Sequence, residues 1–534
     1  MDMARMFAPK RREGARYALP ALTLSTLLLL ATANALAQTS TVTPRLDTSL
    51  TWTDNASSSG LGGFGGRGQG AGDGGTDWIL EVSPGIAVAR DSGRMRGNLN
   101  ASLRNLMYAS NTDNNTSYLS LNGSGQFEAV EDMFFIDADA SISRNNLSAF
   151  STRGSNDLLD VSQDNETRVF TLSPRFQFRI GDNTEGALRY QRRWSNVGNG
   201  LLADQDKDKW SAEITNTRIT GIFGLGLAYN RQSGGSSGGS GSASRQGSQE
   251  QEIARATLYA KISPELRLRG IVGHEKNDYG ASGADSSTIT GGGFDWNPTD
   301  RTAISGTVED RVFGRGYDVS VQHRMSRTTV FASFSRDIES SLDLIAGGGL
   351  NDPFYQALYD EILRLNPGVS PALASDAALL LLRQLRGDVL TNAYFLSRSM
   401  SSGISHVLKR GVVSLTFNRS DRSRLGSADR LAPEDDFSAF DDISTDSISL
   451  SYSHRLTALE SLNTSVTRST STGRGEDSAD TKRTSFQIGL SSSLGPKTTG
   501  ALIYRHQRSD GKGGTFGDSD RRENSVTASL GMSF

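Results

Sequence analysis

Hydrophobic and polar residues alternate along the chain from residue 42 to the end. The run from Ser447 to Leu456 shows the pattern: Ile448, Leu450 and Tyr452 share one face of an extended strand, and serines occupy the other. About 22 such runs follow one another, bounded by Gly, Asn, Asp and Ser. A strand with one apolar and one polar face suits a position between lipid and water. The pattern therefore predicts an all-β fold, a transmembrane antiparallel β-barrel of about 22 strands, within a range of about 18 to 24.

The connections between these runs alternate in length. Short, turn-forming connections lie at 91–93, 181–183, 263–265, 297–300, 409–411 and 495–497. Long polar connections lie near 55–75, 147–164, 234–248, 339–392 and 424–444. Bacterial barrels have short periplasmic turns and longer external loops, so we expect both termini in the periplasm and an even number of strands. One connection, around Gly314–Gly316, is short where a long loop is expected, which leaves the strand count open by about two to four.

The first 37 residues have the three parts of a cleavable secretory signal. A basic stretch precedes an apolar run from Tyr17 to Ala31, and the small residues Ala35 and Ala37 precede a cleavage site before Gln38. An uncleaved membrane anchor is the alternative, but the apolar run is short for a spanning helix. The chain therefore divides into a signal peptide, 1–37, and an outer-membrane barrel, 38–534.

The chain ends in a strand with one apolar face. Its apolar residues are Val526, Ala528, Leu530, Met532 and Phe534. This arrangement resembles the C-terminal signal that the barrel assembly machinery reads, so that machinery and outer-membrane lipid are the expected partners. The alternative is the last strand of a soluble sandwich. Taken with the signal peptide, the strand predicts the outer membrane of a Gram-negative bacterium.

Composition excludes several classes of site. The chain has no cysteine, so disulfides, thiolate catalysis and cysteine metal centres are absent. The predicted leader holds five of the 56 basic and two of the 59 acidic residues, which leaves the mature chain with a net charge of −6. Nucleic acid is therefore not an expected partner. No cofactor is expected either.

All five tryptophans fall at predicted strand ends, where amphipathic rings mark the membrane interfaces. They are Trp52, Trp78, Trp194, Trp210 and Trp296.

The alternation also turns a set of charged side chains toward the lumen. Asp137 and Asp139 alternate with Ile136, Ala138 and Ala140, which face lipid. The basic residues predicted to face inward are Arg189, Arg193, Arg255, Lys261, Arg267, Arg269 and Arg324. Charged walls tune permeation through barrels, although ion pairs that only brace the wall would have the same pattern.

The connection 339–392 predicts two helices. Asp352 and Pro353 suit a helix start, and an apolar stripe that begins at Phe354 continues to Pro367. A second helix is expected from Ala372 to Arg386. These helices could fold into the lumen, cap the mouth or pack only on neighbouring loops. The question matters because barrels near 22 strands usually contain a plug. No plug domain is expected here, since alternation begins within about five residues of the cleavage site, and this disfavours a TonB-dependent receptor.

Acidic clusters are candidate calcium ligands. One cluster, Asp204, Asp206 and Asp208, is expected in an external loop but lacks the glycine and closing glutamate of a calcium loop. Solvated loop surface is the favoured interpretation for both clusters, and no metal site is predicted. The second cluster contains Glu434, Asp435, Asp436, Asp441 and Asp442.

No histidine lies in a recognisable hydrolase motif. Ser405 and His406 are adjacent, but strand neighbours point to opposite faces and cannot form a catalytic pair. Interfacial placement is the favoured interpretation for His454 and His506. We therefore predict that the protein is not an enzyme.

Three segments carry a family resemblance. They read VTPRLDTSLTWTDN from Val42, then DWILEVSPGIAVARDSGRMRG, then GQFEAVEDMFFIDADASIS. They resemble the outer-membrane β-barrel proteins associated with PEP-CTERM sorting systems, and the likeness is best over residues 42–200. Membership would imply a large outer-membrane barrel with a link to exosortase and exopolysaccharide loci. It carries no catalytic residues over to this chain.

Three functions follow as hypotheses. The first is a porin-like channel or conduit linked to exopolysaccharide or matrix export, or to PEP-CTERM protein sorting, with exopolysaccharide as a partner. The second is a non-conducting structural or adhesive surface barrel. The third is an outer-membrane hydrolase, which would need a Ser or Asp within reach of a histidine.

Overall fold

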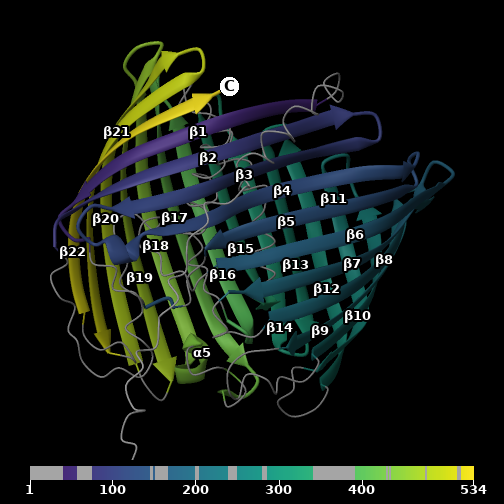
Figure 1. Cartoon of the computed structure of the whole chain (residues 1–534). Coiled ribbons are helices and arrows are strands. Elements are labelled where there is room, and N and C mark those ends of the chain that lie inside the picture. Colours follow the sequence, from purple (N-terminus) through teal and green to yellow (C-terminus); the bar gives the residue numbers. More distant parts are fainter. Residues whose placement is uncertain are drawn as a thin grey trace, which may run out of the picture.

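The computed structural model describes residues 40–56, 75–144, 148–150, 166–198, 204–237, 249–278, 285–340, 391–428, 431, 435–475, 478–513 and 519–534. These residues form one antiparallel sheet of 22 strands, in which every strand pairs with its neighbours in sequence and the last pairs with the first. The sheet closes into a barrel (Figure 1). The predicted fold class, antiparallel order and strand number are confirmed.

The strands of the first half are β1 (Ser40–Thr53), β2 (Asp77–Ser92), β3 (Met95–Tyr108), β4 (Thr116–Val130), β5 (Phe134–Arg144), β6 (Glu166–Ile180), β7 (Thr184–Val197), β8 (Asp204–Thr220), β9 (Phe223–Ser237), β10 (Gln249–Lys261) and β11 (Leu266–Asp278). The strands of the second half are β12 (Asp285–Thr299), β13 (Thr302–Arg311), β14 (Gly314–Arg324), β15 (Thr328–Ser340), β16 (Tyr394–Val407), β17 (Gly411–Leu425), β18 (Phe440–Arg455), β19 (Glu460–Gly475), β20 (Ser478–Gly495), β21 (Thr498–Gly513) and β22 (Ser519–Ser533).

Two short helical segments occur in the described residues, the 3-10 turn η2 (Thr112–Asn114) and the helix α5 (Asp436–Ala439). The two helices predicted within 339–392 lie outside the described residues, as does the predicted signal peptide with Ala35, Ala37 and Gln38. Among the helices that are described, none is long and apolar enough to cross a membrane.

Turns of two to four residues join the strands at one end of the barrel. Gly93 and Gly181 adopt φ values of 50° and 60° there, a backbone region that glycine enters without steric cost. By the rule for bacterial barrels this is the periplasmic end. The other is the outer end, where α5 lies, opposite the C-terminus (Figure 1). The short connection noted in the sequence is real, since only Val312 and Phe313 separate β13 from β14 at the outer end.

The register assigns the side chains of each strand to two faces. Leu415, Leu450 and Val466 are cross-strand partners and all three are exposed on the outer face. Ser414 and Ser451 form the next cross-strand pair along β17 and β18, and both lie on the inner face. An apolar outer wall around a polar interior places the barrel in the outer membrane.

All five tryptophans belong to the outer face. Trp52 and Trp78 are directly opposite each other at the outer ends of β1 and β2. Trp194 stacks on Phe170, with ring centroids 5.4 Å apart. Trp210 is the seventh of the 17 residues of β8, counted from its outer end, and Trp296 lies near the periplasmic end of β12.

The seam between β1 and β22 closes the barrel. Arg45 pairs with Ser533 at one end of the seam and Thr53 pairs with Ser525 at the other. Beyond the last strand residue, the backbone N–H of Phe534 donates to the carbonyl of Pro44 at 2.9 Å. The C-terminal residues on the outer face of this seam are Val526, Ala528, Leu530 and Met532.

Candidate functional site

The inner wall carries the charged residues that the sequence singled out. Asp137 and Asp139 pair with Ser173 and Thr171, which are buried, while their chain neighbours share the outer face with the exposed Phe170. By register the inner face also holds Arg189, Arg193, Arg255, Lys261, Arg267, Arg269 and Arg324.

Asp137 is the centre of one group on this wall. Nitrogens of Arg175 and Arg189 each lie 3.6 Å from its carboxylate, and the Gln126 amide donates to it at 3.0 Å. Arg193 donates instead to the Thr171 hydroxyl at 3.3 Å. The contacts of Asp137 with Gln126 and Arg175 therefore brace the wall, whereas the Arg189 side chain remains 43% exposed.

A second charged group lies on β10 to β14. Arg255 donates to Glu309 at 2.8 Å, and Asp295 accepts from Arg267 at 2.8 Å. Arg269 is 3.2 Å from the same aspartate. Lys261 and Arg324 lie exposed at the periplasmic end, so the lower part of this wall is in contact with water.

The most buried ion pair of the wall was not predicted from the sequence. Arg311 donates to Glu275 through two nitrogens, at 2.8 and 2.9 Å, and through a third nitrogen to Asp337 at 2.7 Å. Glu275 is fully buried and also accepts from Asn277. The alternation places each of these groups on the inner face, but it does not show that side chains on β11, β13 and β15 reach one another.

Serine, threonine and asparagine predominate on the inner face of β16 to β22. Ser449 bonds to Thr467 at 2.9 Å, and Ser461 bonds to Ser491 at 2.8 Å. A further pair joins Thr445 to Ser471. These hydroxyl groups bond across neighbouring strands in rows around this part of the wall.

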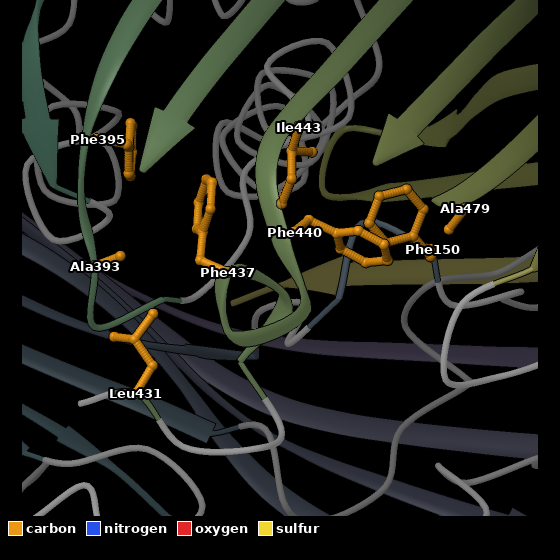
Figure 2. Packing of buried hydrophobic residues seen from close by; sticks show 8 residues of the cluster. All are labelled: Phe150, Ala393, Phe395, Leu431, Phe437, Phe440, Ile443 and Ala479. Atoms are coloured by element: carbon orange, nitrogen blue, oxygen red, sulfur yellow. The ribbon is translucent and has the colours of Figure 1, made fainter. Parts of the chain in front are cut away.

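Apolar side chains gather inside the barrel at its outer end, and we call them the mouth cluster. It brings together the connections that precede β6, β16 and β18 (Figure 2). Phe395 stacks on Phe437 at 5.7 Å, and Phe150 packs on Phe440 at 4.9 Å. Gly473 leaves room for the Phe150 ring, because a Cβ at this position would lie 2.8 Å from Phe150. Its members are Phe150, Ala393, Phe395, Leu431, Phe437, Phe440, Ile443 and Ala479.

Two adjacent carboxylates tie these connections together. Asp435 accepts from the Thr391 hydroxyl at 2.8 Å and from the backbone N–H of Asn392 at 2.9 Å, and it caps α5. Asp436 accepts from the backbone N–H of Ala149 at 2.7 Å. Burial raises the pKa of Asp435 to about 6 and that of Asp436 to about 7, against the effect of these donors.

The segment 391–394 also reaches strands on another part of the wall. Gln205 on β8 donates to Asn392 at 2.6 Å, and the Lys207 ammonium lies 5.7 Å from the Tyr394 ring. Strand β8 is not a neighbour of β16 in the sheet. Contacts between them therefore cross the barrel interior, and the outer mouth is spanned by side chains.

The acidic clusters differ from the loops expected. Asp204, Asp206 and Asp208 lie within β8 on its outer face, where Arg192 pairs with Asp206 and Asp208. Asp435 and Asp436 are buried rather than solvated, and Asp441 and Asp442 belong to β18, where they bond to Arg424 and Ser423. Glu434 lies outside the described residues. No group of three or more His, Asp or Glu in the described chain is placed to hold a metal. Buried loops and polar strand extensions have the same composition as solvated loops, which explains the error.

Four histidines bond to neutral groups. His323 and His406 contact the threonine hydroxyls of Thr302 and Thr328, each at 2.8 Å. His454 contacts the Tyr452 hydroxyl at 2.9 Å. His506 contacts Asn524 at 2.8 Å. All four share the outer face with lipid-facing residues, so none is oriented toward the lumen.

No protein-family model matches the chain, and no curated protein matches it significantly. Among solved structures, the FrpB iron transporter from Neisseria meningitidis (F3-3 variant) is similar with a TM-score of 0.50 and 8% identity, over 94% of this chain and 82% of that one. The siderophore receptor PirA from Acinetobacter baumannii has a TM-score of 0.45 and 9% identity, over 92% and 80%. At such identity the likeness shows the fold alone, a large outer-membrane barrel.

Proposed function

We propose that the protein is a porin-like conduit across the outer membrane whose outer mouth is closed by the mouth cluster. One observation carries this proposal. Inner-wall charges are exposed toward the periplasm, where the Arg267 side chain is 51% exposed, whereas Glu275 and Arg311 at the outer end are buried. A polar, wet wall that ends in an apolar constriction is the arrangement of a gated channel.

The test compares the intact barrel with Phe437→Ala in planar bilayers. Phe437 is 2% exposed, and truncating such a side chain costs about 3 to 5 kcal/mol of local packing. We expect small or rare openings in the intact protein and larger, more frequent openings in the variant. Leu258→Ala, on the lipid face, is the control. Absence of conductance in both the intact protein and Phe437→Ala refutes the conduit.

That outcome favours the second candidate, a structural or adhesive surface barrel. The mouth cluster is the observation that supports it. Asp435 and Asp436 accept hydrogen bonds from two other connections, which suits a permanent seal as well as a gate. This candidate predicts defects in surface attachment or matrix on shortening the external loops, with no conductance. We do not favour the third hypothesis, a hydrolase, since the four bonded histidines described above lie on the outer face and their partners are Thr, Tyr and Asn rather than Ser or Asp.

We further propose exopolysaccharide as the cargo, in connection with a PEP-CTERM sorting system. The sequence resemblance supports this assignment, and so does the hydroxyl-rich wall, since hydroxyl groups bond to sugars without fixed charge. The likeness to the iron transporter and the siderophore receptor concerns the fold alone and does not identify a cargo. Neutral oligosaccharides added on the periplasmic side should block the current of Phe437→Ala. An unblocked current refutes this cargo and leaves the conduit intact.

A further inference from the structure

The rim of the barrel is lowest at the β13–β14 hairpin. These strands have only 10 and 11 residues, whereas β20 has 18. A tilted barrel strand needs about 9 to 11 residues to cross the bilayer. The turn at Val312 and Phe313 therefore marks the level of the outer membrane surface.

Arg336, on the outer face of β15, is fixed at this level. Its guanidinium donates to the Phe313 carbonyl at 3.2 Å and to the Arg315 carbonyl, and it lies over the Phe313 ring. It is eight residues above Thr328, which at about 3.4 Å per residue and a tilt of about 40° corresponds to about 21 Å of height. The apolar band of such barrels is about 25 Å tall, so Arg336 lies near its upper edge.

Two further arginines surround Arg336. Arg398 on β16 is its direct cross-strand partner, and Arg315 on β14 follows the turn glycine. Both side chains are exposed, and neither makes an ion pair within the described part of the chain. Like charges directly opposite each other destabilise a sheet unless something neutralises them.

The nearby carboxylates neutralise this set only in part, because Asp421 interacts electrostatically with Arg398 but forms no ion pair with it. Asp421, the other cross-strand partner of Arg398, accepts from Arg419 at 3.0 Å and from Ser444 at 2.7 Å. Asp310 faces Arg315 across the hairpin without an ion pair. By contrast, a second outward arginine pair, Arg508 and Arg522, has Asp510 at 2.9 Å from Arg508.

The residues below the arginines face lipid. Phe334 and Met400 are cross-strand partners one step lower, and Ile404 is exposed further down β16. We propose that Arg315, Arg336 and Arg398 form a binding site for the phosphate of an outer-leaflet lipid headgroup, with the acyl chains of that lipid lying along this apolar strip. Guanidinium groups are suited to phosphate because they present several N–H donors in one plane.

Native mass spectrometry of the full-length barrel in detergent tests this site, with diphosphoryl lipid A as the probe. Each basic residue near a membrane surface contributes about a fivefold change in affinity for anionic lipid. We expect Arg398→Gln to weaken binding about fivefold and Arg315→Gln with Arg398→Gln about 25-fold. Arg231→Gln, an outer-face arginine that is paired with Glu250 at 2.6 Å, is the matched control and should leave binding unchanged.

Three results would overturn the site. The first is equal binding of lipid A whose phosphates have been removed. The second is an equal loss of affinity in Arg231→Gln. The third is full competition by millimolar inorganic phosphate, which would indicate a free-anion site. Arg336 is left intact because it holds the hairpin, and a shift on unheated gels confirms that each variant is folded.

Discussion

Two regions of the inner wall differ in chemistry, a charged arc on β5 to β15 and a hydroxyl arc on β16 to β22. In the charged arc, Arg255 reaches Glu309 across two intervening strands, and Arg311 reaches Glu275 across one. In the hydroxyl arc, Ser449 reaches only its neighbour Thr467. Long side chains therefore brace non-adjacent strands, whereas these short ones join only neighbouring strands. Phe395, Ile443 and Ala479 of the mouth cluster lie on this second arc.

Breaking the charged arc should have the largest effect. Arg311→Leu leaves Glu275 buried without its cation and removes the partner of Asp337, which costs about 3 to 5 kcal/mol. Urea unfolding of the barrel in detergent micelles measures the loss. Glu275→Gln combined with Arg311→Leu should lose less, because no uncompensated buried carboxylate remains at 275. A single-variant loss below about 1 kcal/mol would mean that the brace contributes little.

The hydroxyl arc should be most sensitive where it supports the mouth cluster. A side chain at Gly473 meets Phe150 at 2.8 Å and Phe440 at 2.9 Å, so Gly473→Val should destabilise the docked cluster by about 1 to 3 kcal/mol. Faster protease cleavage near 435–440 is the expected readout. Gly270→Val serves as a control, since a Cβ there meets nothing within 4 Å. Equal cleavage of both variants contradicts the docking described for Gly473.

The docked cluster should also respond to pH. Docking raises the pKa of Asp435 to about 6 and that of Asp436 to about 7, while exposed carboxylates titrate near 3.9. Between the exposed and the docked pKa values, the docked form binds more protons than the undocked form. Docking is therefore strongest below about pH 4 and weakens as the pH rises to about 7. The docking equilibrium changes by at most about tenfold per pH unit for each carboxylate. Arg424 faces Asp435 and opposes part of this shift.

Channel openings in planar bilayers should therefore become more frequent between pH 5 and pH 7.5. Asp436→Asn removes one titrating group and should flatten the profile. An unchanged profile in this variant would assign the pH response to other residues.

The smallest effect is expected within the hydroxyl rows. Ser449→Ala removes one neutral hydrogen bond and leaves Thr467 in a polar lumen, which costs about 0.5 to 1.5 kcal/mol. The double variant Ser449→Ala with Thr467→Val should lose little more. A loss as large as that of Arg311→Leu would remove the distinction between the two arcs.

Alternation and turn chemistry predicted the strand number and the antiparallel order because both are local properties of the chain. Asp204 to Asp208 were assigned to a loop, since a strand that extends beyond the bilayer has no apolar face to identify it. The mouth cluster was not predicted either. Asp435 and Asp436 have the composition of a solvated loop. They are buried by contacts with other connections, Asp435 with Asn392, 43 positions away, and Asp436 with Ala149, 287 positions away.

The strand order has a consequence for the way this barrel assembles. Every strand pair except one joins neighbours in sequence, so 21 of the 22 ladders can form as local hairpins or extensions of them. The remaining ladder, between β1 and β22, joins residues such as Arg45 and Ser533. Closing a chain segment of that length costs about 5 kcal/mol of entropy, concentrated in a single step. We therefore expect the β1–β22 seam to form last during folding and to be the slow step of assembly.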